Sequence, residues 1–212
     1  EEVALLKKII KLTEAGHSVK HAATLVQQQA EESIESPETH TDQTNYFLLA
    51  LEEAGVVADD KKIMHLLEQA HHLFGVEATM EQIIVPFLRR IGELWCEKKW
   101  GEYQEAVSSQ TIRDFLANLR RHFYIPENAP LVVGSCLPNE RHEIPMQILL
   151  VQCMLRGYRT LMLGPAPAPT AIESTVSLAS PAIVLLTAST QAVWKDNGEA
   201  LRALDAFAKT MP

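Results

Sequence analysis

The spacing of apolar and polar positions divides the chain into helical and strand-like parts. Apolar residues recur every three or four positions through residues 3–30, with an interruption at "EAGHS", where Gly16 and Ser18 are typical of a helix end and a helix start. This spacing predicts two helices. Residues 31–42, "EESIESPETHTD", are rich in Glu, Ser and Thr and nearly free of apolar side chains, so they predict a linker between domains.

Helical spacing then continues through residues 43–124. Candidate breaks fall at residues 55–60, 75–78 and 97–103, where Gly, Asp and Lys interrupt the apolar pattern. Four segments joined by short breaks predict an antiparallel four-helix bundle.

After "YIPENAP" the apolar pattern shortens. The runs "LVVGS", "YRTLML" and "AIVLLT" are separated by helix-like segments, which is typical of βαβ units in a parallel sheet with helices on both faces. The predicted fold class is therefore α plus α/β: a four-helix bundle followed by a Rossmann-like (flavodoxin-like) parallel-sheet domain over residues 128–212. Ligands gather at the carboxyl ends of such strands, where "CLPNERH", "GPAPAP" and "TAST" are expected to lie.

Composition limits the class of protein. The chain has 212 residues, of which 47% are hydrophobic, and a formal net charge of −8, which disfavours nucleic-acid binding by the chain as a whole. No apolar run approaches the roughly 20 residues of a membrane span, and nothing at the start resembles an export signal, so we expect a cytoplasmic protein that does not enter a membrane. The three cysteines are widely spaced without a CxxC pair, which favours reduced thiols.

A histidine is the strongest candidate for chemistry. His142 stands in "SCLPNERHEIP", the loop that follows the first predicted strand, and Glu140 precedes it by two positions. A neutral imidazole is a good ligand for a transition metal, and an acidic neighbour can orient its other nitrogen. A loop histidine can also be a solvent-facing residue with no ligand, in the same way that Trp95 can be a core residue and Glu105 a solvated one.

The order of these motifs resembles a known family. A helical region with "IGELW" and a Glu ten positions after the Trp, followed by a strand-and-helix domain opening with "NERHEIP", resembles the cobalamin-binding module of methionine synthase and corrinoid carrier proteins. The likeness is greatest to its light-sensing version in CarH/LitR-type MerR regulators, and it extends over nearly all of the chain. Residues 1–30 then resemble the closing helices of a MerR-type DNA-binding domain.

The resemblance implies roles for particular residues in the sheet domain. In the family an acidic-x-His-x-x-Gly loop supplies the lower axial ligand of cobalt, and Glu140, His142 and Pro145 occupy those places. The family's Ser-x-Leu element falls at "TAS", with Thr187 at the serine position. "LGPAPAP", which includes Gly164, stands where the family has a Leu-Gly segment beneath the corrin tail.

On the helical side, the family caps the upper face of the cofactor with a Trp, a Glu and an adjacent His. Trp95 and Glu105 match, whereas the His position is Ala106. Pro145 in place of Gly is a second departure, because proline lacks a backbone N–H and restricts the chain around it.

Three functions are compatible with these residues. The first is a light- or ligand-responsive transcriptional regulator, not an enzyme, that binds cobalamin (adenosylcobalamin), acts as a homo-oligomer and reads operator DNA through an upstream winged helix. The second is a corrinoid methyl carrier, which would have no need of the MerR-like residues 3–25. The third is the same fold holding biliverdin, heme or no cofactor. Because Glu1 is not Met and the last predicted strand would leave a free sheet edge, we expect a portion of a longer protein, with the sheet domain incomplete.

Overall fold

The computed structural model describes residues 37–168 and 170–210, and the side chains from Thr41 onward within these ranges. The two helices predicted in residues 1–30 lie outside the described residues. The chain divides into two compact units, residues 1–49 and residues 50–212. The second unit contains both the later helices and the sheet, which the sequence had assigned to separate domains at residues 43–124 and 128–212.

The first described element is helix α3, Pro37–Val56. It begins inside the range predicted as a linker, so residues 37–42 of that range are helical. Proline is favoured in the first turn of a helix, where its missing N–H would have no partner in any case. The polar composition of this stretch therefore marked the start of a helix.

Three helical segments follow at the predicted places. They are α4 (Asp60–Ala78), which continues through the π-helix η1 (Thr79–Ile84) into α5 (Val85–Cys96), and α6 (Glu102–Arg121). The predicted break at residues 75–78 is a kink without a loop, because Gly75 adopts φ 79° and ψ 176° while the helix continues. The Thr79 hydroxyl donates to the Gly75 carbonyl over 2.6 Å and bridges the kink.

The helices of the second unit share an apolar core. Fully buried side chains recur at helical spacing on each segment, and they include Ile63, Leu67, Met80, Ile83, Phe87, Ile112 and Leu116. Burying one such side chain contributes roughly 1.5–3 kcal/mol. At the end of α3, the ring of Trp100 fills the space beside Gly55, so that a Cβ at Gly55 would overlap it.

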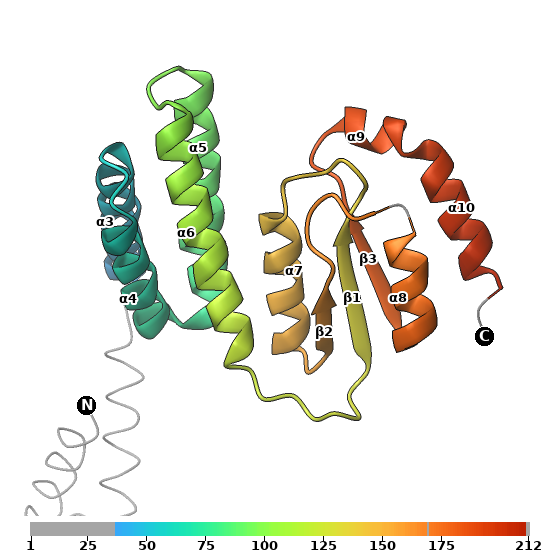
Figure 1. Ribbon diagram of the computed structural model, residues 1–212. Helices are drawn as coiled ribbons and strands as arrows, with labels where there is room; N and C mark the ends of the chain where they lie inside the picture. Colours follow the sequence, from blue (N-terminus) through green and yellow to red (C-terminus); the bar gives the residue numbers. More distant parts are fainter. Residues whose placement is uncertain (1–36, 169, 211–212) are drawn as a thin grey trace, which may run out of the picture. The chain divides into compact units, whose positions relative to one another are not determined.

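The sheet confirms the predicted fold class. Its parallel strands are β1 (Leu131–Cys136), β2 (Arg159–Met162) and β3 (Ile183–Thr187), in the order β2-β1-β3. The helices that connect and follow them are α7 (Ile144–Leu155), α8 (Ala171–Ala179), α9 (Gln191–Asp196) and α10 (Gly198–Ala208). Figure 1 shows α7 on one side of the sheet and α8 and α10 on the other, as in a doubly wound fold.

The central strand β1 is the anchor of this domain. Val132, Val133 and Cys136 are buried, and Gly134 lies so close to α7 that a Cβ would come within 2.5 Å of the Met146 sulfur. Because β1 has a strand on either side, the loop that leaves its carboxyl end is flanked by the end of β3. This arrangement positions the loop that carries His142.

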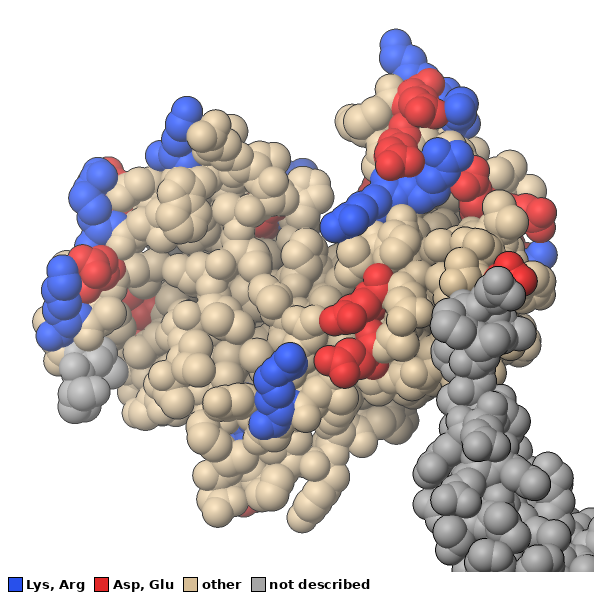
Figure 2. Space-filling view, turned by 180° about the vertical axis from the view of Figure 1, so that it is seen from behind, with Lys and Arg blue, Asp and Glu red and all other residues tan. Residues whose placement is uncertain are grey.

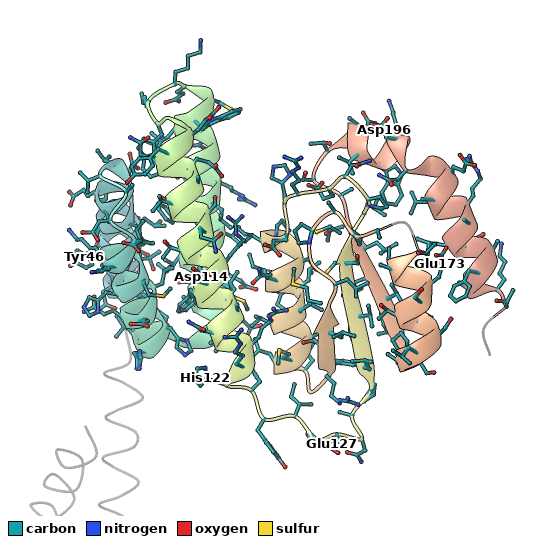
Figure 3. All side chains as sticks on the ribbon, in the orientation of Figure 1. Tyr46, Asp114, His122, Glu127, Glu173 and Asp196 are labelled. Carbon is teal, nitrogen blue, oxygen red and sulfur yellow. The ribbon has the colours of Figure 1, made fainter. Side chains whose placement is uncertain are left out.

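The described surface carries charged side chains of both signs (Figure 2). Figure 3 shows His122 at the end of α6 and Glu127 in the connection to β1. On the face seen in Figure 2, Lys and Arg side chains are scattered among acidic ones and form no continuous basic band among the described residues. Within the described ranges, no helix combines the length and the apolar character that crossing a membrane requires.

Candidate functional site

The His142 loop begins with one backbone contact to the end of β3 and one turn. The Leu137 N–H donates to the Thr187 carbonyl at the end of β3 over 3.0 Å, and the Glu140 N–H donates to the Leu137 carbonyl over 3.0 Å. Asn139 adopts φ 66°, a left-handed conformation that asparagine tolerates better than most residues. These contacts bring the Glu140 side chain under the loop, where it is 1% exposed.

Pro145 does not disturb the loop. It lies in the first turn of α7, which begins at Ile144. The first N–H groups of a helix have no partner within the helix, so a proline there removes no hydrogen bond. The departure from the family's glycine is therefore compatible with the local backbone.

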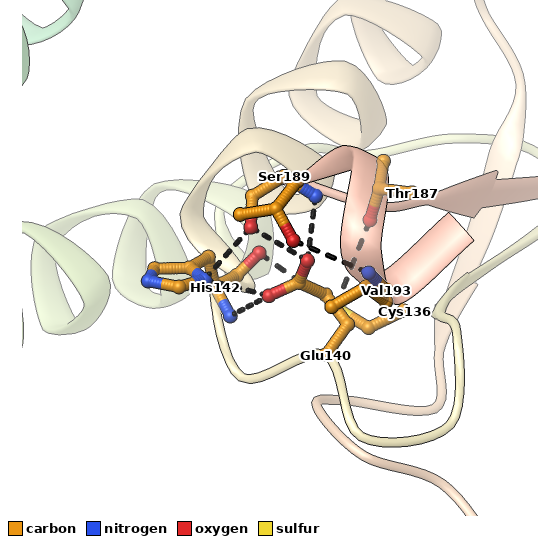
Figure 4. A network of polar contacts seen from close by, with 7 residues as sticks. Cys136, Glu140, His142, Thr187, Ser189 and Val193 are labelled. Atoms are coloured by element: carbon orange, nitrogen blue, oxygen red, sulfur yellow. Dashed lines mark hydrogen bonds and ion pairs between the residues drawn. The ribbon is translucent and has the colours of Figure 1, made fainter. Parts of the chain in front are cut away.

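Glu140 holds His142 from two directions. One carboxylate oxygen, Oε1, accepts from the backbone N–H of His142 over 2.7 Å and lies 2.6 Å from its Nδ1. The other, Oε2, accepts from the Ser189 hydroxyl over 2.6 Å and from its backbone N–H over 2.5 Å. Ser189 Oγ also lies 2.9 Å from His142 Nδ1, and Figure 4 shows these contacts as one network.

The network fixes the charge of Glu140 and, through it, the tautomer of His142. Burial alone would raise the pKa of Glu140, but hydrogen bonds from Ser189 and His142 outweigh burial and lower the pKa to about 2. An ionised carboxylate only accepts hydrogen bonds, so we assign the proton of the neutral imidazole to Nδ1. Nε2 then carries the lone pair, on a side chain that is 70% exposed and whose ring extends away from Glu140 (Figure 4).

His142 lines a cavity of about 530 Å³ in the second unit. Three of the six predicted cofactor-binding residues meet there: Trp95, Glu105 and His142. The remaining lining residues come from α5 (Leu88, Ile91, Gly92), from α6 (Glu102, Ser109, Arg113), from the loop and start of α7 (Arg141, Glu143, Ile144, Pro145) and from Ser189.

Trp95 belongs to the cavity wall and is not a residue of the helical core, because it is 52% exposed. Its indole offers a flat apolar surface to a ligand. Glu105 accepts a hydrogen bond from the Ser109 hydroxyl over 2.8 Å, one turn further along α6. Glu102 and Glu143 add two further carboxylates to the lining, which sequence reasoning missed.

Ala106 is exposed and is not among the cavity-lining residues. On the sheet side of the cavity, the Arg113 guanidinium lies 3.8 Å from the Glu143 carboxylate. The cavity lining therefore combines an apolar wall with three carboxylates and two arginines, Arg113 and Arg141, around a single imidazole.

The other predicted residues lie apart from the cavity lining. The Thr187 hydroxyl lies 3.7 Å from the Cys136 sulfur, and the residue that hydrogen-bonds Glu140 is Ser189, two positions further on. Gly164 follows β2 with φ 83°, and its carbonyl accepts from the Cys136 N–H over 3.4 Å. Cofactor binding by Thr187 and Gly164 stays a prediction. A polar side chain just past the end of β3 was the available signal for Ser189.

The fold and site define a class: a helical region followed by a Rossmann-like parallel sheet whose first loop carries a carboxylate-supported histidine. Residues 49–120 match the family model described as "B12 binding domain". This match supports a cobalamin-binding module in the chain.

One curated protein and two solved structures show the similarity. The chain is 23% identical to the HTH-type transcriptional repressor CarH of Myxococcus xanthus over 77% of the chain's length, and it spans 56% of the length of that relative. One similar solved structure is that of a cobalamin-binding protein from Desulfitobacterium hafniense. It has 16% identity and a TM-score of 0.37, and the match covers 75% of this chain and 77% of that protein's chain. A chain of the methanol:cobalamin methyltransferase complex MtaBC from Methanosarcina barkeri has 14% identity, 83% and 71% coverage and a TM-score of 0.37.

Proposed function

We propose that the cavity binds cobalamin, with His142 Nε2 as the axial ligand of cobalt. One observation carries the proposal: a solvent-accessible imidazole, fixed through Nδ1 by an ionised carboxylate, lines the same cavity as Trp95 and Glu105. Carboxylate–histidine pairs of this kind orient metal ligands and raise their basicity. The match of residues 49–120 to the B12 binding domain supports the same ligand.

The donor set fits a metal that a macrocycle already holds. Such a metal needs only one axial ligand from the protein, and the exposed Nε2 of His142 can supply it. Glu140 and Ser189 hold the ring, the indole of Trp95 provides an apolar wall, and Glu105 provides an acceptor for hydroxyl or amino groups. Bound cobalamin would supply a metal centre that can exchange a ligand.

We further propose that the chain is part of a light- or ligand-responsive transcriptional regulator of the CarH/LitR type and not an enzyme. The similarity to a protein named as an HTH-type transcriptional repressor supports this role. In this scheme Trp95 would contact the bound cofactor, and a change in the cofactor would alter the packing around α5 and α6 and thereby the contacts between subunits. A homo-oligomer would present paired upstream winged helices to operator DNA, and linked sites bind with greater avidity.

The test of the ligand is a titration of the apoprotein in the dark. Adenosylcobalamin, methylcobalamin, heme and biliverdin are added separately, and binding is followed by absorption. We expect the cobalamins to bind and His142→Ala to shift the bound spectrum or weaken binding. His122→Ala is the matched control, because the side chain of this exposed histidine at the end of α6 bonds only to the Asn118 carbonyl within the described residues. Tight binding of heme or biliverdin without any cobalamin would overturn the assignment.

The test of the switch is the mass of the loaded protein in solution. Sedimentation is compared in the dark and after illumination, with the apoprotein alongside. We expect the oligomeric state of the adenosylcobalamin-loaded protein to change on illumination, while that of the apoprotein stays constant. An identical mass in all conditions would contradict the coupling between ligand and assembly.

A further inference from the structure

A buried amide reaches the His142 loop from the far end of the sheet domain. Asn197 lies at the junction of α9 and α10 and is 5% exposed. Its side-chain Nδ2 donates to the Pro138 carbonyl over 2.8 Å and to the Val193 carbonyl over 2.9 Å. Both N–H bonds of one amide are therefore used, one within α9 and one on the loop.

The backbone of Asn197 is fixed as well. Its N–H donates to the Val193 carbonyl over 3.2 Å, and its carbonyl accepts from the Leu201 N–H over 2.9 Å. The residue thus closes α9 and opens α10 at once. A side chain anchored in this way has little freedom, so the position of the Pro138 carbonyl follows the position of the helix junction.

Pro138 can form a backbone hydrogen bond only through its carbonyl, because proline has no N–H. The next residue, Asn139, adopts φ 66°, a conformation that costs energy and persists only where the surrounding structure imposes it. Glu140, the carboxylate that holds His142, follows directly.

We propose that Asn197 is a positioning residue for His142: it fixes the Pro138–Asn139 turn and so the place of Glu140. The segment after β3 then holds the metal ligand at two points, through Ser189 on the carboxylate and through Asn197 on the loop backbone. A displacement of the α9–α10 junction would then move the loop that carries His142. This inference rests on the proposed role of His142 as a cobalt ligand.

The variants are Asn197→Asp, which keeps the shape but has no donor, and Asn197→Ala. Asp196→Ala is the matched control, since it alters the exposed neighbour at the end of α9 (Figure 3). The first measurement is amide hydrogen exchange of the apoprotein over residues 137–143. We expect exchange there to be roughly fivefold to thirtyfold faster in both Asn197 variants, as for the loss of one or two hydrogen bonds. Segments from α4 and α6 should exchange as in the unaltered protein.

The second measurement is the absorption spectrum with methylcobalamin bound. We expect the Asn197 variants to shift part of the way toward the His142→Ala spectrum, while Asp196→Ala leaves it unchanged. Unchanged loop exchange and spectrum in both variants would overturn the inference, as would unfolding of the whole chain in both, because a positioning residue leaves α4 and α6 intact. If His142→Ala itself has no effect on the spectrum, the proposed function fails, whatever the loop exchange shows.

Discussion

Replacing Glu140 with glutamine tests the central feature of the site, an ionised carboxylate that accepts hydrogen bonds on both oxygens. The amide has the same shape but only one oxygen. Whichever way it turns, its NH₂ group faces donors, either the N–H of His142 or the N–H and hydroxyl of Ser189. The variant therefore keeps the hydrogen bonds to one side and places two donors against each other on the other side. Because the side chain is 1% exposed, water cannot relieve this conflict.

The expected magnitude follows from the pKa of Glu140. Hydrogen bonding outweighs burial and lowers this pKa from 4.5 to about 2. At about 1.4 kcal/mol per pKa unit, the ionised form gains at most roughly 3 kcal/mol of folding stability at pH 7. Because the folded pKa lies below the unfolded one, this contribution is complete above pH 4.5 and is lost as the pH falls toward 2.

The assay is urea unfolding of the apoprotein at pH 7, 5, 4 and 3. We expect the Glu140→Gln variant to be less stable than the unaltered protein by roughly 2–3 kcal/mol at pH 7 and by less than half of that at pH 3. Glu127→Gln, in the exposed connection before β1 (Figure 3), is the control for the loss of a surface charge. Equal stability at pH 7, or a difference that stays constant with pH, would refute the reasoning.

Three further substitutions test the cavity and the packing of the helices. Trp95→Ala should leave the thermal midpoint close to that of Trp194→Ala, since the two indoles are 52% and 53% exposed, but only the first should weaken cobalamin binding in a titration. Gly92→Ala places a methyl group in the cavity, where nothing lies within 4 Å. It should stabilise α5 by up to about 1 kcal/mol and lower the affinity for cobalamin. An unchanged affinity for cobalamin would argue against the cavity as the binding site. Gly55→Ala should lower the unfolding free energy by about 1–3 kcal/mol, because the new Cβ overlaps the buried Trp100 ring; a neutral result in urea unfolding would show that the ring can move aside.

The sequence predicted what depends on short-range pattern. Strand positions, the breaks near residues 55–60 and 97–103, and the pairing of Glu140 with His142 are all set within a few residues. The ten-position spacing from Trp95 to Glu105 brought both residues to one cavity, because α5 and α6 are joined by a short turn.

What the sequence did not predict depends on partners distant in the chain or on local compensation. Ser189 reaches Glu140 across 49 positions, and a polar residue just past the end of β3 does not by itself indicate that contact. At Gly75 a glycine suggested a break, yet the Thr79 hydroxyl bridges the kink and the helix continues. Trp95 carried no sign of its exposure, since the apolar spacing of "IGELW" is equally typical of a buried residue.

The distance along the chain between His142 and its supports sets an order on folding. Strand β1, helix α7 and strand β2 are consecutive, and they can form as a local unit. Ser189 contacts Glu140 from 49 positions away, and Asn197 contacts Pro138 from 59 positions away. Both contacts require that β3 has already paired with β1. During synthesis His142 is therefore made before the residues that orient it, and its hydrogen-bonded support is complete only after Ser189 and Asn197 have left the ribosome.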